Sequence, residues 1–167
     1  SNSFAFTTWW ADARNRPITE LVDFTKTFFA KHTLLHILTR YCVFDVDRKL
    51  LVMRPYQIVA AEQILQRIVT STHHKQLGRI QAGGYIWHTT GSGKTLSSFK
   101  AAQLARALPK VEKVLFVVDR KDLDYQTMRE YERFEKGAAN SNTSTAVLQK
   151  QLEDPNARII ITTIQKL

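Results

Sequence analysis

The sequence predicts an α/β fold in which helices cover a parallel sheet. Two apolar runs, residues 114–118 and 159–161, lack the polar alternation of a half-exposed strand, as strands buried on both faces do. Helical patterns separate these runs, and strands that alternate with helices imply βαβ units. A glycine-rich loop before a further helical pattern is typical of a P-loop NTPase. We therefore expect a P-loop domain preceded by a helical segment.

The first part of the chain predicts helices. Residues 17–41 carry apolar side chains at helical spacing in two pieces, with Pro17 in the first helical turn and Thr33 as the cap of the second piece. The charged turn at residues 45–49 ends this region and is the best candidate for a domain boundary.

After this turn, the pattern alternates between short apolar runs and helices. The expected strands cover residues 50–53, 84–87, 114–118 and 159–161. The expected helices cover residues 55–70, 94–108 and 122–134, with a short one that ends at residue 152. Polar loops are expected at residues 71–75 and 137–144.

The chain is basic. Its 24 Lys and Arg residues against 15 Asp and Glu residues give a formal net charge of +9, which favours a polyanionic partner such as nucleic acid. Cys42 is the single cysteine, expected as a small buried apolar residue, and its lack of an internal partner suits the reducing cytoplasm. No run approaches the ~18 apolar residues that a membrane-spanning helix requires.

The segment from His88 to Thr95 matches the phosphate-binding P-loop except at its first position. A triphosphate requires many donors aimed at one point, which the backbone amides of a tight loop at a helix N-terminus supply. Gly91 and Gly93 let the backbone approach the phosphates and adopt unusual dihedral angles. Lys94 is expected to contact the β- and γ-phosphates, and Thr95 to offer its hydroxyl to Mg²⁺.

Three further segments are candidates for contacts with nucleotide and DNA. Gln57 lies at the start of the helix at residues 55–70, where its amide offers a donor and an acceptor to adenine. Residues 119–121 and 162–165 follow the two buried strands at their carboxyl ends, where open α/β sheets place ligand-contacting loops. The candidate nucleotide-binding residues are Arg54, Gln57, Thr90, Gly91, Ser92, Gly93, Lys94 and Thr95. The candidate DNA-binding residues are Asp119, Arg120, Lys121, Thr162, Thr163 and Gln165.

The order of these segments resembles the first RecA-like motor domain of superfamily-two helicases and translocases. The amino-acid sequences of residues 53–57, 84–95, 116–127 and 162–167 are similar to motifs of the motor (R) subunit of type I restriction enzymes. The helical stretch at residues 24–38 is similar too, so the resemblance covers nearly the whole chain. In this family, histidine at position 88 is an expected variant.

The resemblance implies that the chain is part of an ATP-dependent double-stranded DNA translocase and restriction endonuclease. Residues 1–48 would connect an absent N-terminal nuclease domain to the motor, and residues 49–167 would form the N-terminal part of its first RecA-like domain. ATP and Mg²⁺ would be the cofactors, with Lys94 and Thr95 as the catalytic residues present. The partners would be double-stranded DNA and the methyltransferase and specificity subunits of the complex.

Two expected parts of such a motor are missing from the sequence. No Asp-Glu pair follows a buried strand after the P-loop, and no paired acidic residues of a nuclease site stand before residue 50. We therefore expect the 167 residues to bind nucleotide weakly and not to hydrolyse it.

Three other classes of protein remain open. A small P-loop kinase would carry an acceptor site and an arginine-bearing lid, and residues 137–144 show neither. A non-catalytic module that binds DNA or a partner subunit would use the net charge and keep its function without Lys94. Another superfamily-two translocase would differ only in the amino-acid sequence of these motifs.

Some conspicuous side chains are expected to be structural. His73 and His74 lie in a polar loop without further ligands at suitable spacing, which does not favour a metal site. The aromatic residues at positions 9, 10, 28 and 29 are expected in the core or a covered interface, and His88 beside Trp87.

Overall fold

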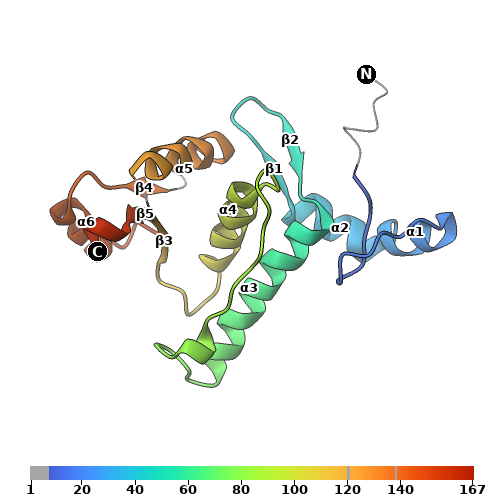
Figure 1. The fold of residues 1–167 in the computed structure, drawn as a ribbon, viewed down its shortest axis with the longest axis horizontal. Coiled ribbons are helices and arrows are strands. Elements are labelled where there is room, and N and C mark those ends of the chain that lie inside the picture. Colours follow the sequence, from blue (N-terminus) through green and yellow to red (C-terminus); the bar gives the residue numbers. More distant parts are fainter. Residues whose placement is uncertain (1–7, 120, 138) are drawn as a thin grey trace.

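A computed structural model of the chain describes residues 8–119, 121–137 and 139–167 (Figure 1). Its first elements are two short helices, α1 (Leu21–Phe28) and α2 (Lys31–Arg40). The two predicted helical pieces are confirmed, but the helix does not begin at Pro17, which forms an antiparallel bridge with Ala11. The carboxylate of Asp12 closes this loop by accepting hydrogen bonds from the backbone of Arg14 and Arg16.

The predicted cap of the second helix is also wrong. Thr33 lies inside α2, whose N-cap residue is Ala30, and no side chain caps this helix end. Thr33 is therefore an internal residue of the helix.

A β-hairpin follows α2. It consists of β1 (Cys42–Phe44) and β2 (Leu50–Val52), which pair antiparallel, and the charged turn at residues 45–49 joins them. Within the turn, the backbone N–H of Val46 donates to the carbonyl of Arg133 at the end of α5. The hairpin thus spans residue 48 and contacts the rest of the chain, while the division into two domains stays a prediction.

The helices α3 (Pro55–His73) and α4 (Lys94–Ala105) pack against each other. Ala61 of α3 and Ala101 of α4 are buried together with Tyr41 and Met53, and small side chains let the two helices approach closely. α3 begins at Pro55 as predicted, but it continues through residues 71–73, which we expected to be a loop. A 3₁₀ turn, η2 (Ile80–Ala82), follows it.

The rest of the chain forms a parallel sheet with helices on both faces. The strands β3 (Val114–Val118), β4 (Asn140–Ser141) and β5 (Ile159–Thr163) lie in the order β3-β5-β4, and both pairings are parallel. Helix α5 (Lys121–Phe134) and helix α6 (Thr145–Glu153) connect them, and the 3₁₀ turn η3 (Ile164–Lys166) follows β5. The predicted fold class is confirmed, although β4 occupies part of the loop expected at residues 137–144.

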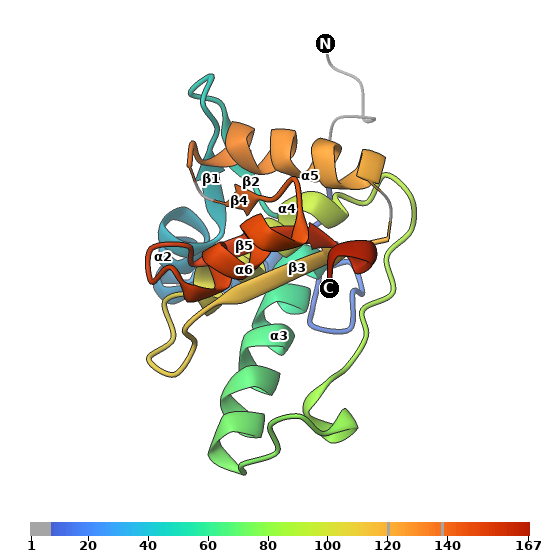
Figure 2. The same ribbon diagram turned by 90° about the vertical axis from the view of Figure 1, so that its left-hand side faces the viewer.

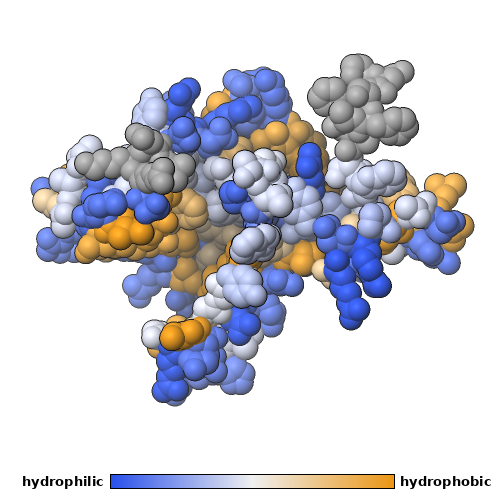
Figure 3. All heavy atoms as spheres, in the orientation of Figure 1, coloured by the Kyte–Doolittle hydropathy of each residue, from blue (hydrophilic) through white to orange (hydrophobic). Residues whose placement is uncertain are grey.

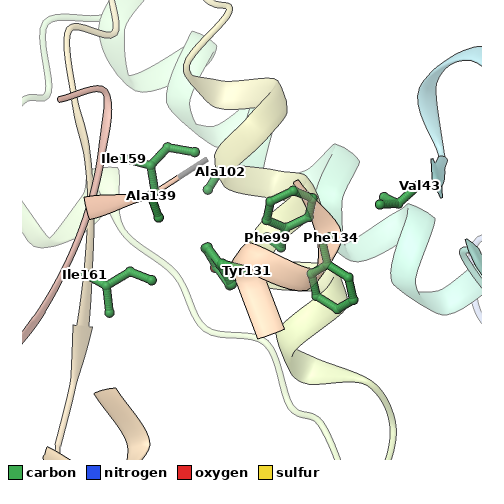
Figure 4. Close-up of a cluster of buried hydrophobic side chains, with 8 residues drawn as sticks. All are labelled: Val43, Phe99, Ala102, Tyr131, Phe134, Ala139, Ile159 and Ile161. Atoms are coloured by element: carbon green, nitrogen blue, oxygen red, sulfur yellow. The ribbon is translucent and has the colours of Figure 1, made fainter. Parts of the chain in front are cut away.

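Alternate side chains of β5 bury the two faces of the sheet. Ile159 and Ile161 join the main core with Phe99 of α4 and with Tyr131 and Phe134 of α5 (Figure 4). Ile160, which points to the opposite face, packs on Leu148 of α6 and on Ala157. Figure 2 shows α5 and α6 on different sides of the strands. The run at residues 159–161 is apolar throughout because both of its faces are covered.

The strand predicted at residues 84–87 is absent. This segment runs from η2 to α4 without strand structure, and in the part of the chain that the structure describes no strand pairs with it (Figure 2). Tyr85 and Trp87 are 91% and 89% exposed. An apolar segment forms a strand only where a second strand completes its backbone hydrogen bonds. The prediction was wrong because no described strand lies beside this segment.

Figure 3 shows hydrophilic side chains over much of one face and apolar side chains near α1. The aromatic ring of Trp10 packs edge-on against Phe28, but Phe29 remains 56% exposed, so this cluster is only partly covered. Among the described residues, no helix combines the length and apolar character needed to cross a membrane.

Candidate nucleotide-binding site

The P-loop connects the exposed segment at residues 84–87 to the first turn of α4. Gly91 and Gly93 have φ angles of +76° and +78°, in the left-handed region that side chains disfavour. The prediction that these glycines permit unusual backbone angles is therefore confirmed. Gly93 is the N-cap residue of α4, so the loop leads directly into that helix.

The N-terminus of α4 carries unsatisfied donors. The first backbone N–H groups of any helix have no acceptor within the helix, and no side chain caps this one. Lys94 is the first residue of α4 and is exposed, and Thr95 follows it in the first turn, half-buried. Exposed amides, the positive end of the helix dipole and an ammonium group together favour an anion here.

The ammonium of Lys94 lies close to the loop. Its Nζ donates to the carbonyl of Thr89 at 3.3 Å, and the same carbonyl accepts the hydroxyl of Ser92 at 2.7 Å. A carbonyl oxygen that is already well occupied is a weak partner for an ammonium at this distance, so Lys94 is available to a stronger acceptor such as a phosphate oxygen.

Helix α3 holds the loop from behind through Gln57. This side chain is 4% exposed, and its Nε2 donates to the carbonyls of Ser92 at 3.1 Å and Gly93 at 3.2 Å. Its Oε1 accepts the backbone N–H of Arg54 at 2.8 Å, at the N-cap of α3. The amide predicted to contact adenine therefore uses its donors and its acceptor inside the protein in this structure, and the Arg54 side chain is exposed beside it.

The side chain of Gln57 also explains one of the glycines. A β-carbon on Gly93 would lie 2.4 Å from Nε2 of Gln57, whereas one on Gly91 would meet nothing within 4 Å. Gly91 is thus required for its backbone angle alone, and Gly93 for both its angle and this close contact.

Tyr56 and His88 complete the contacts around Ser92. The hydroxyl of Tyr56 donates to the Ser92 carbonyl at 2.8 Å, and its ring packs edge-on against His88 with centroids 6.0 Å apart. Nδ1 of His88 lies 2.9 Å from Oγ of Ser92. Because the hydroxyl proton of Ser92 goes to the Thr89 carbonyl, His88 must donate through Nδ1–H. His88 was expected to pack beside Trp87, but it contacts Tyr56 and Ser92, and Trp87 is exposed. Its structural role stays a prediction.

Among the described residues, no group of three or more His, Cys, Asp and Glu side chains is placed to hold a metal. His73 and His74 are both exposed and contact each other edge-on. The donor set at the P-loop, a threonine hydroxyl beside unsatisfied amides, fits Mg²⁺ only as a companion of bound phosphates.

The candidate DNA-binding residues lie at the carboxyl edge of the sheet, but not all of them reach the surface. Nε2 of Gln165 donates to the carbonyl of Asp119, which joins the loops after β3 and β5. Thr162 and Thr163 are both 0% exposed. Contrary to prediction, these two hydroxyls face the interior of the protein. Arg120 lies outside the described residues, and Lys121 is the first residue of α5.

Beside this edge is a hollow of about 580 Å³. Its lining includes Gln165, Lys166 and the residues at 141–145, which bring side-chain amides and hydroxyls together with an ammonium group. Ser144 caps α6 by accepting the backbone N–H of Val147. No ligand-contacting role was predicted for residues 141–145, although their run of Ser, Thr and Asn before a helix was the available signal.

No role was predicted for Tyr56 either, although it stands directly before Gln57 at a helix start. Its importance depends on Ser92, 36 positions later, which only the folded chain brings near.

Residues 56–167 match the SWI2/SNF2 ATPase family. Over 161 residues, 95% of this chain, the sequence is 49% identical to the C-terminal part of a putative type I restriction endonuclease subunit of Mycoplasma pneumoniae, of which it covers 78%. The chain belongs to the family of type I restriction endonuclease subunits.

Other members of this restriction family are similar over different lengths. The type I restriction endonuclease subunit of Staphylococcus saprophyticus is 42% identical over 95% of this chain, which spans 16% of that protein. The subunit of the Escherichia coli enzyme EcoprrI is 55% identical over 76 residues, 46% of this chain and 24% of that protein. The resemblance noted from the motifs is therefore confirmed, and the matched family is that of an ATPase.

Proposed function

We propose that this chain binds MgATP through residues 88–95 as part of an ATP-dependent double-stranded DNA translocase and restriction endonuclease. The observation that carries the proposal is the loop at the N-terminus of α4, where two left-handed glycines leave the first amides of the helix uncapped beside Lys94. This arrangement suits a polyphosphate better than any other common ligand because it offers several donors and one cation to one point.

Each residue of the loop has a part in binding. The amides from Gly91 to Thr95 would donate to the phosphates, and Lys94 would leave the Thr89 carbonyl for the β- and γ-phosphate oxygens. Thr95 would offer its hydroxyl to the Mg²⁺ that accompanies the phosphates. Mg²⁺ neutralises charge that develops during phosphoryl transfer. Thr90 and Ser92 complete the wall of the loop.

Recognition of adenine by Gln57 requires a rearrangement. The amide would have to give up or share its bonds to the Ser92 and Gly93 carbonyls. Gln57 would then couple the base to the shape of the phosphate loop, and the exposed Arg54 would lie at the same edge of the site.

The proposed DNA contacts lie along the carboxyl edge of the sheet. Asp119, Arg120, Lys121 and Gln165 remain candidates, and the buried Thr162 and Thr163 would support them from within. The net charge of +9 and the amides, hydroxyls and ammonium group among the residues that line the hollow next to Gln165 favour the phosphate backbone over base edges. Contacts of this kind position DNA without selecting a sequence.

The full protein would assemble with the methyltransferase and specificity subunits of a type I restriction complex. Residues 1–48 would connect a nuclease domain to the motor, and residues 49–167 would form the first part of its first RecA-like domain. The carboxylates that activate water would come from other parts of the protein, so these residues alone would not hydrolyse ATP.

The deciding experiment measures ATP hydrolysis by the full-length subunit assembled with its methyltransferase. The substrates are unmodified target duplex, methylated duplex and no DNA, and Lys94→Ala is the inactive control. Hydrolysis that requires unmodified duplex and disappears in the variant supports the restriction motor. Hydrolysis indifferent to DNA would favour a kinase or a generic ATPase, and DNA binding that persists without hydrolysis would leave a non-catalytic binding module.

A further inference from the structure

Tyr56 is the one residue outside the P-loop that contacts it with both a hydroxyl and an aromatic ring in the described part of the chain. The hydroxyl donates to the carbonyl of Ser92 at 2.8 Å, and the ring packs against His88 at the start of the loop. His88 in turn donates to the hydroxyl of Ser92. Tyr56 thus touches both ends of the turn that forms the loop.

The direction of the Ser92 carbonyl decides where the next amide points. In a planar trans peptide, the C=O and the N–H lie on opposite sides. Tyr56 and Gln57 draw the Ser92 carbonyl towards α3, so the N–H of Gly93 points away from α3. The Gly93 carbonyl is held in a similar way by Gln57 and by the hydroxyl of Ser97 at 3.2 Å, which directs the N–H of Lys94.

The left-handed glycines make this restraint necessary. Gly91 and Gly93 have the largest conformational freedom of any residue type, so without outside contacts the Ser92–Gly93 peptide would sample other orientations. A donor with a short, rigid connection limits that freedom better than a flexible one. Tyr56 supplies such a donor because α3 fixes its backbone and its ring rests on His88.

We propose that Tyr56 is a positioning residue of the nucleotide site, whose hydroxyl sets the orientation of the Ser92–Gly93 peptide before phosphate arrives. The inference rests on the proposed binding of MgATP at this loop. Loss of the hydroxyl leaves the fold and the catalytic groups in place, but the loop must then be ordered by the nucleotide itself. Binding becomes weaker, while the rate of the bound complex stays almost unchanged.

The test uses Tyr56→Phe in the full-length subunit, assembled in its complex. Tyr41→Phe is the matched control, because it removes the same atom from another part-buried hydrogen bond, that of Tyr41 to Glu62 at 2.8 Å, away from the loop. For each protein we would measure KM and kcat for DNA-dependent ATP hydrolysis, Kd for MgADP by calorimetry, and the midpoint of thermal unfolding.

We expect Tyr56→Phe to raise KM and Kd about five- to tenfold, with kcat within about twofold of the wild type. Tyr41→Phe should change neither KM nor Kd, even where it lowers the unfolding temperature as much. An unchanged Kd in Tyr56→Phe, or an equal rise in Tyr41→Phe, would overturn the positioning role and leave the proposed function intact. If the wild type and Lys94→Ala hydrolyse ATP equally, the proposed function itself is wrong.

Discussion

The side-chain amide of Gln57 occupies the space that a β-carbon on Gly93 would need. That carbon would lie 2.4 Å from Nε2 of Gln57, although the two residues are 36 positions apart in the chain. Helix α3 and the P-loop are therefore fitted to each other at this point, and a change on one side is felt on the other.

The two left-handed glycines give a matched test of this fit. Gly93→Ala should destabilise the folded protein more than Gly91→Ala, because both suffer the backbone strain of about 1–3 kcal/mol but only the first displaces Gln57. The measurement is urea unfolding of the purified subunit. In a Gln57→Ala background the difference between the two glycine variants should vanish. A difference that survives there would mean that Gln57 is not its cause.

Thr162 and Thr163 at the end of β5 allow a test of whether their buried hydroxyls stabilise the fold or contact DNA. Thr162 donates to Oδ1 of Asn142 at 3.0 Å, whereas the buried hydroxyl of Thr163 meets no hydrogen-bond partner among the described residues. Thr162→Val should therefore lower the free energy of unfolding by about 1–3 kcal/mol, and Thr163→Val should leave it unchanged or raise it.

The same two variants should bind DNA as the wild type does, because neither hydroxyl reaches the surface. Fluorescence anisotropy with a labelled duplex at several salt concentrations measures this. A loss of affinity in Thr163→Val at unchanged stability would restore the original prediction that the hydroxyl faces DNA.

Lys100 is a buried cation that connects the P-loop helix to the hairpin. It is 6% exposed, and its Nζ donates to the carbonyl of Cys42 at 3.0 Å and to Oε1 of Gln103 at 2.8 Å. Burial lowers the pKa of this ammonium. Lys100→Met should cost about 1–3 kcal/mol in urea unfolding, because two acceptors lose their partner. Lys150→Met on exposed α6 is the control and should stay within about 0.5 kcal/mol of the wild type. An equal loss of unfolding free energy in the two variants would show that the hydrogen bonds of Lys100 do not stabilise the fold.

The raised pKa values of two buried tyrosines, Tyr41 and Tyr131, predict that the folded protein becomes less stable at alkaline pH. Burial raises the pKa of Tyr131 from 10.0 to about 12, and burial together with the hydrogen bond to Glu62 does the same for Tyr41. A tyrosine with a raised pKa stabilises the folded state fully below pH 10. This contribution is lost as the pH rises towards 12, because the unfolded chain releases its proton first.

The measurement is the unfolding midpoint between pH 9 and pH 12, compared with Tyr131→Phe, in ~1-unit steps. The variant should show a shallower decline, since it removes one of the two tyrosines that titrate late. Lys100, whose lowered pKa acts in the opposite direction, contributes equally to both proteins and cancels in the comparison. Parallel curves would indicate that Tyr131 ionises normally.

The sequence by itself determined the elements that depend on local chemistry. The P-loop is defined by glycines that permit left-handed angles and by a lysine at a helix start, and both features were confirmed. The parallel strands were predicted at residues 114–118 and 159–161 because strands buried on both faces are apolar throughout, and the second continues through Thr163 in the structure. The family could be recognised because its motifs consist of such local features.

Only the tertiary structure decided which groups are free and which are already paired. The amide of Gln57 was expected at adenine, and only the folded chain shows that it already donates to the carbonyls of Ser92 and Gly93. Thr162 and Thr163 were expected to contact DNA, but both side chains are fully buried in the folded chain. The apolar segment at residues 84–87 had the sequence of a strand but no neighbour to complete it. In each case, the pairing or burial of the residue depends on a partner far along the chain. Patterns in the sequence report only on residues that are close together in it.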